Sequence, residues 1–234
     1  MYKQKIGNGG YVDFINKSGD DSLIVDSARI SYGKENSHHT EEFLVNFLTS
    51  LLERGHDTPF EHCSITMDVS VPLIVARQWM RHRTGKYNEV SGRYTEFQCE
   101  FYVPDKVRFK ANIEWTDELN AQALDIICES YDRAESSYKK LLRMGVAREL
   151  ARLVLPLGMY TKFRCTFDLH NLFHFLDLRL DKHAQKEVRD YAEAVYNTLP
   201  KIFPAASVAY RRSRGLDANY EPKTVRYPML KEEL

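Results

Sequence analysis

Three segments of the sequence alternate apolar and polar side chains, and this alternation most constrains the fold. They run from Ile65 to Val71, from Phe97 to Val103 and from Met159 to Phe167. Period-two alternation is typical of strands that bury one face. Pro72 and Pro104 follow two of the segments, where a residue without a backbone N–H favours the end of a strand. We therefore expect three strands.

Apolar residues recur at helical spacing in the stretches around these strands. The expected helices cover 40–55, with Thr40 as the N-cap and Gly55 as the stop; 73–82; Thr116 or Asp117 to Gly145; 147–155; 169–179, capped by Asp168; and 184–199. Strands and helices interleave without regular βαβ spacing. This order predicts an α+β (mixed α/β) fold with a mostly antiparallel sheet flanked by helices.

Composition limits the class of protein. The 234 residues include 33 basic and 33 acidic side chains, and this balance argues against a general nucleic-acid or anionic-membrane surface. No long apolar run or signal-like N-terminus is present, so we expect a cytoplasmic protein. Cys63, Cys99, Cys128 and Cys165 form no CxxC pair and are expected to be buried small hydrophobes. No repeat or linker is visible, so residues 1–234 are expected to form one domain with a polar tail from Ser207 packed on the body or a neighbour.

The segment from Arg81 to Arg93 gathers three arginines, a lysine and a histidine around one carboxylate. Arginine offers planar, bidentate donors suited to phosphate, and Ser91-Gly92 offers a hydroxyl and a closely approachable backbone. A solvated basic face is the alternative interpretation. The apolar residues on both sides would hold the segment against a core, which favours a site for an anionic ligand.

The triplet Arg81-His82-Arg83, followed after seven residues by Ser91, resembles the signature of the flavin-dependent thymidylate synthases. The resemblance covers about Ser27 to Tyr191. It extends through 55–62, 76–79, 88–94, Ala151-Arg152, 155–157, 175–179 and 183–185. It implies reductive methylation of dUMP to dTMP, with 5,10-methylenetetrahydrofolate as carbon donor, NADPH as reductant and FAD as carrier of the reducing equivalents. It also implies a homotetramer whose sites are built from several subunits.

The resemblance implies a dUMP site. Its residues are Gln78, Trp79, Met80, Arg81, Glu89, Val90, Ser91, Gly92, Arg93, Arg152 and Arg179. Arg179 is implied as the catalytic group, because a positioned guanidinium can stabilise charge on the N3 and O4 side of the uracil ring. Taken alone, Arg179 also suits a cation at a helix C-terminus. Ser91 has no neighbouring general base in the sequence, so we assign it to binding.

FAD is implied by the family resemblance and not by a fingerprint, because no GxGxxG lies between a strand and a helix. The implied FAD residues are Thr58, Arg81, His82, Arg83, Glu89, Asp168, Leu169, His170 and His174. Asp168 and His170 depart from the Asn and Arg that are frequent in relatives, and a carboxylate near a diphosphate is unfavourable without a donor. His56 and Tyr94 are candidates for the folate and nicotinamide side of the flavin, and His56 also suits a helix end.

Two other classes of function have some of the required residue types in this sequence. His170 and His174 lie four residues apart, with His183, Asp168 and Asp181 nearby, but HxxxH is a weak metal motif and no metal is expected. The basic segment with its tyrosines has the residue types of a nucleic-acid-binding module, without a supporting global charge or known motif. The expected partners are therefore small molecules, and neither nucleic acid nor membrane.

Overall fold

The computed structural model describes residues 2–33, 38–110 and 112–216. The chain divides into two compact units. The sheet unit comprises residues 1–19 and 60–198, and the helical unit comprises the described parts of 20–59 and 199–234.

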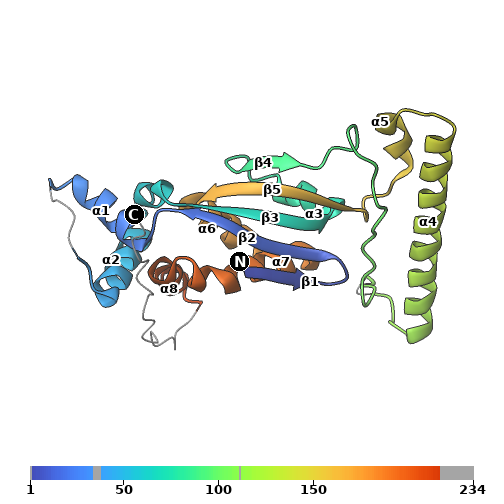
Figure 1. The fold of residues 1–234 in the computed structure, drawn as a ribbon. Coiled ribbons are helices and arrows are strands. Elements are labelled where there is room, and N and C mark those ends of the chain that lie inside the picture. Colours follow the sequence, from blue (N-terminus) through green and yellow to red (C-terminus); the bar gives the residue numbers. More distant parts are fainter. Residues whose placement is uncertain (1, 34–37, 111, 217–234) are drawn as a thin grey trace. The chain divides into compact units, whose positions relative to one another are not determined.

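The sheet unit contains a sheet of five strands among the described residues, in the order β1-β2-β3-β5-β4, and every pairing is antiparallel (Figure 1). The strands are β1 Tyr2–Ile6, β2 Gly10–Ser18, β3 Ser64–Pro72, β4 Lys86–Glu89 and β5 Tyr160–Asp168. In the centre, Met67 pairs with Cys165 and Val69 pairs with Phe163, and all four side chains are buried. The prediction of an antiparallel sheet with strands at 65–71 and 159–167 is confirmed.

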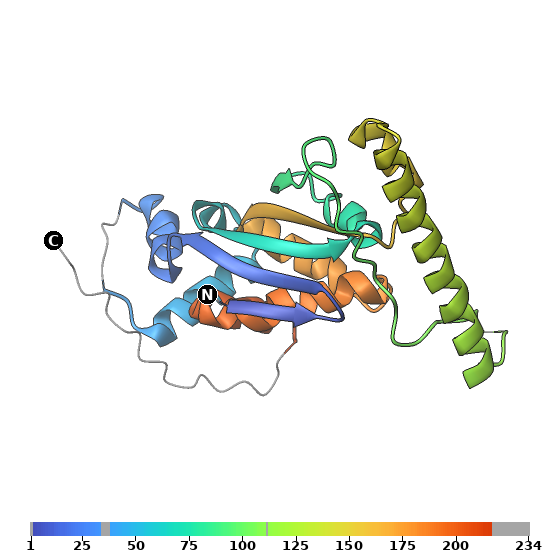
Figure 2. The same cartoon turned by 45° about the vertical axis from the view of Figure 1, so that its right-hand side comes forward.

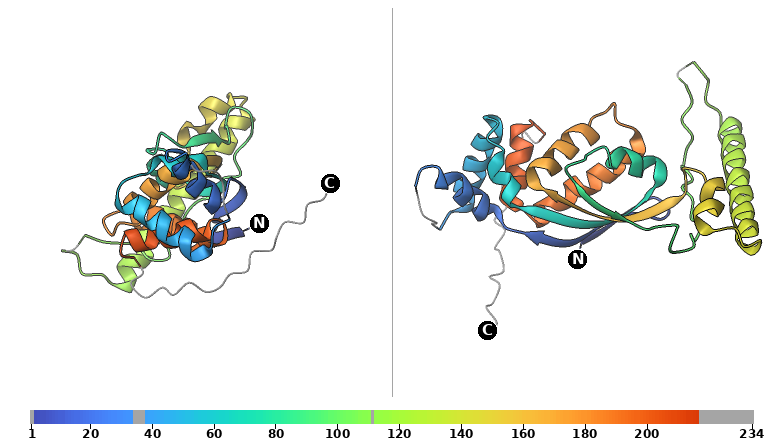
Figure 3. Two further views of the ribbon diagram at one scale, coloured as in Figure 1. Left: turned by 90° about the vertical axis from the view of Figure 1, so that its left-hand side faces the viewer. Right: turned by 90° about the horizontal axis from the view of Figure 1, so that it is seen from above.

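Helices cover one face of this sheet, as the right-hand view of Figure 3 shows for α3, α6 and α7. The helices of the unit are α3 Leu73–Trp79, α4 Asp117–Arg143, α5 Arg148–Ala151, the 3-10 helix η2 Arg152–Val154, α6 Leu169–Arg179 and α7 Lys186–Thr198. Between them and the sheet, the fully buried Trp79 packs against Phe163, Phe175 and Tyr191, with ring centroids 5.7, 4.6 and 6.4 Å away. Figure 2 shows α4 beyond one end of the strands.

The helical unit is formed by segments far apart in the sequence. It contains α1 Asp21–Ile30, α2 Glu41–Glu53, the 3-10 helix η3 Leu199–Lys201 and α8 Pro204–Ser213, while the 3-10 helix η1 Thr58–His62 crosses the boundary between the units. The buried Asp21 carboxylate accepts hydrogen bonds from the backbone N–H groups of Ala205 and Ala206, at 3.1 and 2.9 Å. These bonds satisfy donors at the start of α8, which would otherwise have no partner within the helix.

The expected helices are present with small shifts at their ends. Thr40 caps α2, Thr116 caps α4 and Asp168 caps α6, each by accepting a backbone N–H through its side chain. The helix expected over 73–82 ends at Trp79, so Arg81 and Arg83 lie in the turn that follows. None of the described helices has both the length and the apolar character that crossing a membrane would require.

The strand predicted from Phe97 to Val103 is wrong. Only Phe101 forms an isolated bridge there, with Met159, and Cys99 has a positive φ of 45° that interrupts an extended run. Phe101 stacks on Tyr131 of α4 at 4.6 Å, and the Phe97 N–H donates to the Tyr138 hydroxyl at 3.2 Å. The alternation therefore reflects packing against a helix rather than pairing within the sheet.

Several elements were missed. β4 occupies part of the stretch expected to be a loop, and neither the β1–β2 hairpin nor α1 was predicted. The tail from Ser207 was expected to be polar, but Ser207 to Tyr210 are buried in α8; residues 217–234 of that tail lie outside the described part of the chain. Cys63 and Cys165 are buried as expected, whereas Cys128 is exposed on α4 and Cys99 is half-buried.

Candidate active site

Arg179 lies in the last turn of α6 and reaches toward the segment that follows α3. Its Nε donates to Nε2 of His82 at 3.1 Å, and one terminal nitrogen donates to the backbone carbonyl of Gln78 at 3.1 Å. Burial and the nearby positive charge of Arg81 lower the pKa of the Arg179 guanidinium. Two contacts fix the plane of the group, and its remaining N–H donors can face a ligand.

His82 is buried beneath this guanidinium. Its ring packs 5.0 Å from the Phe175 ring and 5.8 Å from the His174 ring. Burial, with the charges of Arg179 and His174, lowers the pKa of His82 from 6.5 to about 4. The imidazole is therefore neutral at physiological pH and accepts a hydrogen bond from Arg179 through its unprotonated nitrogen.

The end of α3 is held in place by Trp79 and Tyr87. The Trp79 side chain lies entirely in the core, where its Nε1 has no hydrogen-bond partner among the described residues, so only its backbone is available to a ligand. The Tyr87 hydroxyl, from β4, donates to the carbonyl of His82 at 2.9 Å. Arg81 and Arg83 are exposed on either side of His82, and Met80 is half-buried.

A second group of predicted residues gathers around the loop that follows β4. The Val90 N–H donates to the carbonyl of Lys162 at 2.9 Å, and the Ser91 hydroxyl accepts from the Arg93 N–H at 3.3 Å. Upstream in β4, Glu89 accepts from the Thr161 hydroxyl at 2.6 Å. The loop is thus tied to β5, with its polar groups at the edge of the sheet.

Gly92 and Glu149 bring Arg152 to this loop. A Cβ atom at Gly92 would lie 2.3 Å from the Phe97 ring and 3.1 Å from the Arg152 side chain, so a larger residue does not fit without movement. Arg93 pairs with the Glu149 carboxylate at 3.3 Å, and the Arg152 Nε donates to the Glu149 carbonyl at 3.3 Å. The described structure therefore places the predicted dUMP residues in two groups, one around Arg179 and one around Gly92.

The predicted flavin residues at the start of α6 have different surroundings. Asp168 accepts from the Asn171 N–H at 2.8 Å and from the Asn171 side-chain amide at 2.7 and 2.9 Å. Leu169 is fully buried, whereas His170 is half-buried and His174 is exposed. The Asp168 carboxylate thus faces donors of its own helix, which lowers the penalty of a carboxylate near an anionic ligand.

His56, Thr58 and Tyr94 lie on exposed positions. His56 and Thr58 belong to the helical unit, where His56 follows the end of α2 and Thr58 begins η1. Tyr94 belongs to the sheet unit and is 77% exposed, with the Arg93 guanidinium 5.6 Å from the centre of its ring. These residues are open to a ligand, and their roles stay predictions.

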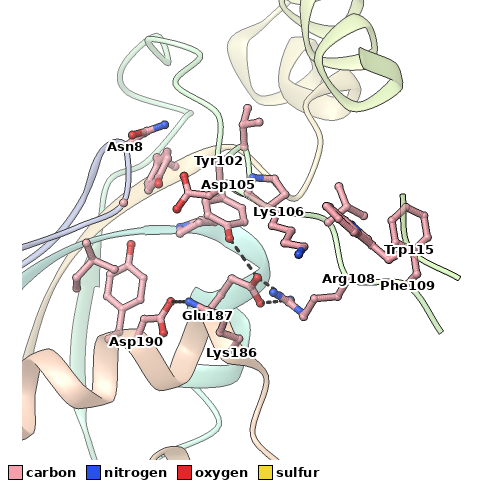
Figure 4. A pocket seen from close by; sticks show the side chains of 18 residues that line it. Asn8, Tyr102, Asp105, Lys106, Arg108, Phe109, Trp115, Lys186, Glu187 and Asp190 are labelled. Carbon is pink, nitrogen blue, oxygen red and sulfur yellow. Dashed lines mark hydrogen bonds and ion pairs between the residues drawn. The ribbon is translucent and has the colours of Figure 1, made fainter. Parts of the chain in front are cut away.

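A pocket of about 680 Å³ in the sheet unit was not predicted from the sequence. Figure 4 shows Tyr102 and Arg108 converging on the carboxylate of Glu187, which comes from α7. The predicted dUMP residues do not line this pocket. One signal in the sequence was available: Glu187 shares helical spacing with the apolar residues Tyr191 and Val195, so a carboxylate occupies a buried face.

Among the described residues, no three histidine, cysteine or acidic side chains gather closely enough to hold a metal ion. His174 faces His82, as described above, and Asp168 is engaged by Asn171. The contact with His82 gives His174 a structural role.

Several known proteins are similar to this chain over most of its length. A family profile described as "Thymidylate synthase complementing protein" matches residues 13–205. A flavin-dependent thymidylate synthase of Thermosipho africanus is 44% identical over 207 residues, covering 86% of this chain and 90% of that protein. The enzyme of the same name from Treponema denticola is 38% identical over 226 residues, covering 92% and 84%.

Among solved structures, a UMP/dUMP methylase, PolB from Streptomyces cacaoi, bound with 5-Br dUMP, is similar with a TM-score of 0.80. It is 31% identical, and the match covers 87% of this chain and 95% of that one. The sequence and structural similarities both extend over most of the chain, and the profile match includes the segments that form the candidate site. The chain therefore belongs to the family of flavin-dependent thymidylate synthases.

Proposed function

We propose that the protein methylates dUMP to dTMP, with 5,10-methylenetetrahydrofolate as carbon donor and NADPH as reductant by way of FAD. The observation that carries this proposal is the fixed guanidinium of Arg179, held by neutral His82 and the Gln78 carbonyl. C5 of the uracil ring is a poor nucleophile unless charge on the N3 and O4 side is stabilised. Arg179 supplies that stabilisation without reorganising, which is the condition under which such electrostatic effects are large.

The second group of residues suits the rest of the nucleotide. Ser91, Gly92, Arg93 and Arg152 combine a hydroxyl, an open backbone and two guanidinium groups, which match a phosphate. Glu89 has an acceptor for the sugar hydroxyl. Gln78, Met80, Arg81 and Val90 complete the proposed dUMP site, together with the backbone of Trp79.

The residues proposed for FAD fit an anionic dinucleotide. Arg81 and Arg83 are exposed cations, and the one carboxylate at the start of α6, Asp168, is satisfied by Asn171. The proposed FAD residues are Thr58, Arg81, His82, Arg83, Glu89, Asp168, Leu169, His170 and His174. When bound, FAD supplies the two-electron chemistry that the reduction requires.

The remaining parts of the proposal come from the family. His56 and Tyr94 are assigned to the folate and nicotinamide side, and the protein is proposed to be a cytoplasmic homotetramer in which residues 1–234 act as one functional domain. Sites built from several subunits would bring the Arg179 group and the Gly92 group of different copies to one nucleotide. This arrangement accounts for two groups of residues within one chain.

The substitution Arg179→Ala tests the proposal. We expect the purified variant to keep the visible absorption bands of bound FAD and to lose about 10²- to 10³-fold in the rate of dTMP formation, the usual effect of removing one such donor. Arg164→Ala is the matched control, since Arg164 is an arginine of the same unit that pairs with Asp68 on an exposed part of the sheet. Near-normal dTMP formation by the Arg179 variant would remove Arg179 from the catalytic role.

A further inference from the structure

A chain of hydrogen bonds connects the pocket of Figure 4 to the candidate nucleotide site. In the pocket, Glu187 accepts from Arg108 at 2.6 and 2.8 Å and from the Tyr102 hydroxyl at 3.1 Å (Figure 4). Behind it, the Gln185 side-chain amide donates to Glu187 at 2.8 Å. The Gln185 oxygen in turn accepts from the side-chain amide of Gln78 at 2.5 Å.

The charge state of Glu187 determines which group donates and which accepts in each of these hydrogen bonds. Burial alone raises the pKa of the Glu187 carboxyl, but hydrogen bonds from Arg108 and Gln185 outweigh burial and lower the pKa overall. An ionised carboxylate accepts hydrogen bonds and cannot donate them. Gln185 must therefore turn its NH₂ group toward Glu187 and its oxygen toward Gln78.

The orientation of Gln78 follows from that of Gln185. One N–H of its NH₂ group is committed to the Gln185 oxygen, which places the Gln78 side-chain oxygen at the other end of the amide, where it is available to a ligand. Gln78 also lies within the candidate site, because its backbone carbonyl holds Arg179. The carbonyl end of the amide can only accept a hydrogen bond, so it recognises a donor on the nucleotide.

We infer that Glu187 and Gln185 are positioning residues that fix the Gln78 amide with its oxygen toward the nucleotide, and that this oxygen selects for a hydrogen-bond donor on dUMP. The inference rests on the proposed function and adds to it a determinant of specificity. Two groups of dUMP have the required chemistry, the sugar hydroxyl and the imide N–H. Neither Glu187 nor Gln185 needs to touch the nucleotide.

The substitution Glu187→Gln tests the inference, since it keeps the size of the side chain and removes the constraint. A glutamine at this position can donate to the Gln185 oxygen. The side-chain amides of Gln185 and Gln78 can then both flip, so that their oxygen and NH₂ groups exchange places. Calorimetry on the oxidised holoenzyme, without reductant, gives dissociation constants for dUMP, its 3′-deoxy analogue and its N3-methyl analogue. We expect the natural protein to bind one analogue roughly tenfold more weakly than dUMP, the usual effect of one hydrogen bond.

In the Glu187→Gln variant, dUMP should bind roughly three- to tenfold more weakly, and the preference for dUMP over that same analogue should disappear. The analogue whose affinity becomes equal to that of dUMP in the variant shows which donor of dUMP the Gln78 oxygen binds, the 3′-hydroxyl or the N3–H. Asp190→Asn is the matched control, because Asp190 lies on the same helix and the same pocket but pairs with Lys186; it should keep the natural values. Gln185→Met, at a half-buried position, serves as a second variant and should also reduce the preference.

The outcomes separate the inference from the proposed function. If the natural protein binds dUMP and both variants keep its affinity and its preference, the positioning role is wrong while the proposed function stands. If the natural protein shows no binding of dUMP, both are overturned. A uniform loss of affinity for all three ligands, with the preference unchanged, also contradicts the inference, since it indicates a general structural effect.

Discussion

At the scale of residues, His82 illustrates how position changes chemistry. The family resemblance assigns it to the flavin, and two exposed arginines flank it in the sequence. The structure buries His82 against Phe175 and uses its Nε2 to hold Arg179. A charged imidazolium in that position would repel the guanidinium, so the site depends on a neutral ring.

This neutrality predicts a dependence of stability on pH. Above 6.5 both the folded and the unfolded protein keep the imidazole neutral, so His82 adds no pH dependence there. As the pH falls from 6.5 to about 4, His82 becomes protonated in the unfolded chain but stays neutral in the folded protein, so the folded protein loses stability relative to the unfolded chain. The full gap in pKa corresponds to at most about 3 kcal/mol.

Denaturant unfolding of the natural protein and of His82→Gln, at one protomer concentration, measures the effect. Glutamine can still accept from Arg179 but does not titrate. The stability of the natural protein relative to the variant should therefore decrease between pH 7 and pH 4, in the direction set by the lowered pKa of His82. A relative stability that is constant over this range would show that His82 is not held neutral.

Ser91 gives a second prediction for a single residue. Its hydroxyl accepts the Arg93 N–H, and its carbonyl accepts from the N–H groups of Tyr94 and Thr95, so both groups shape the loop that is proposed to bind the phosphate. Ser91→Ala should weaken dUMP binding roughly threefold to tenfold and leave measurable turnover at saturating dUMP. Steady-state kinetics and calorimetry separate the two effects. Complete loss of turnover with unchanged dUMP affinity would support a nucleophilic serine.

At the scale of elements, the N-terminus of α6 combines a structural and a proposed binding role. Asp168 caps the helix by accepting the Asn171 N–H, and it lies where the FAD diphosphate is proposed to bind. A cap requires an oxygen acceptor, which aspartate and asparagine supply about equally well. Negative charge, by contrast, opposes an anionic ligand.

The two roles can be separated by substitution. Asp168→Asn should leave the free energy of unfolding unchanged within about 0.5 kcal/mol and tighten FAD binding. Asp168→Ala should lower the free energy of unfolding by about 1 kcal/mol, because the cap is lost. Denaturant titration of the apoprotein and fluorescence titration with FAD provide the two measurements. Unchanged FAD affinity in the asparagine variant would place the carboxylate away from the diphosphate.

The wrong strand at 97–103 and the missed β4 share one cause. Alternation reports which side chains are buried, and Phe97 and Phe101 are covered by α4 rather than by a sheet. β4 is short and at the edge, with Lys86, Asn88 and Glu89 exposed, so its pairing with β5 leaves little apolar signal. Such an element depends on its partner strand and not on its own sequence.

At the scale of the whole molecule, the helical unit depends on residues almost two hundred positions apart. Asp21, at the start of α1, satisfies the first N–H groups of α8, which the sequence did not predict. The buried carboxylate would be unfavourable without such donors, and α8 would begin with unsatisfied donors without the carboxylate. The start of α1 and the start of α8 therefore stabilise each other within this unit.

Asp21→Ala should accordingly lower the free energy of unfolding by about 2–3 kcal/mol, because it leaves buried N–H groups without an acceptor. Asp21→Asn keeps one acceptor oxygen and should lose about half of that amount. Chemical denaturation followed by circular dichroism measures both. Equal stability of the alanine variant and the natural protein would contradict a role for this contact between distant segments.

The sequence by itself determined the family, the antiparallel class of the sheet, two of its three inner strands, and the N-caps of α2, α4 and α6. These features are local, since period, capping residues and a motif of fixed spacing are all visible along the chain. Only the tertiary structure decided that His82 and Gln78 hold Arg179, that Gln185 and Glu187 lie behind Gln78, and that Asp21 caps α8. Such contacts join segments distant in sequence, and burial sets their hydrogen bonds and charge, so no local pattern specifies them.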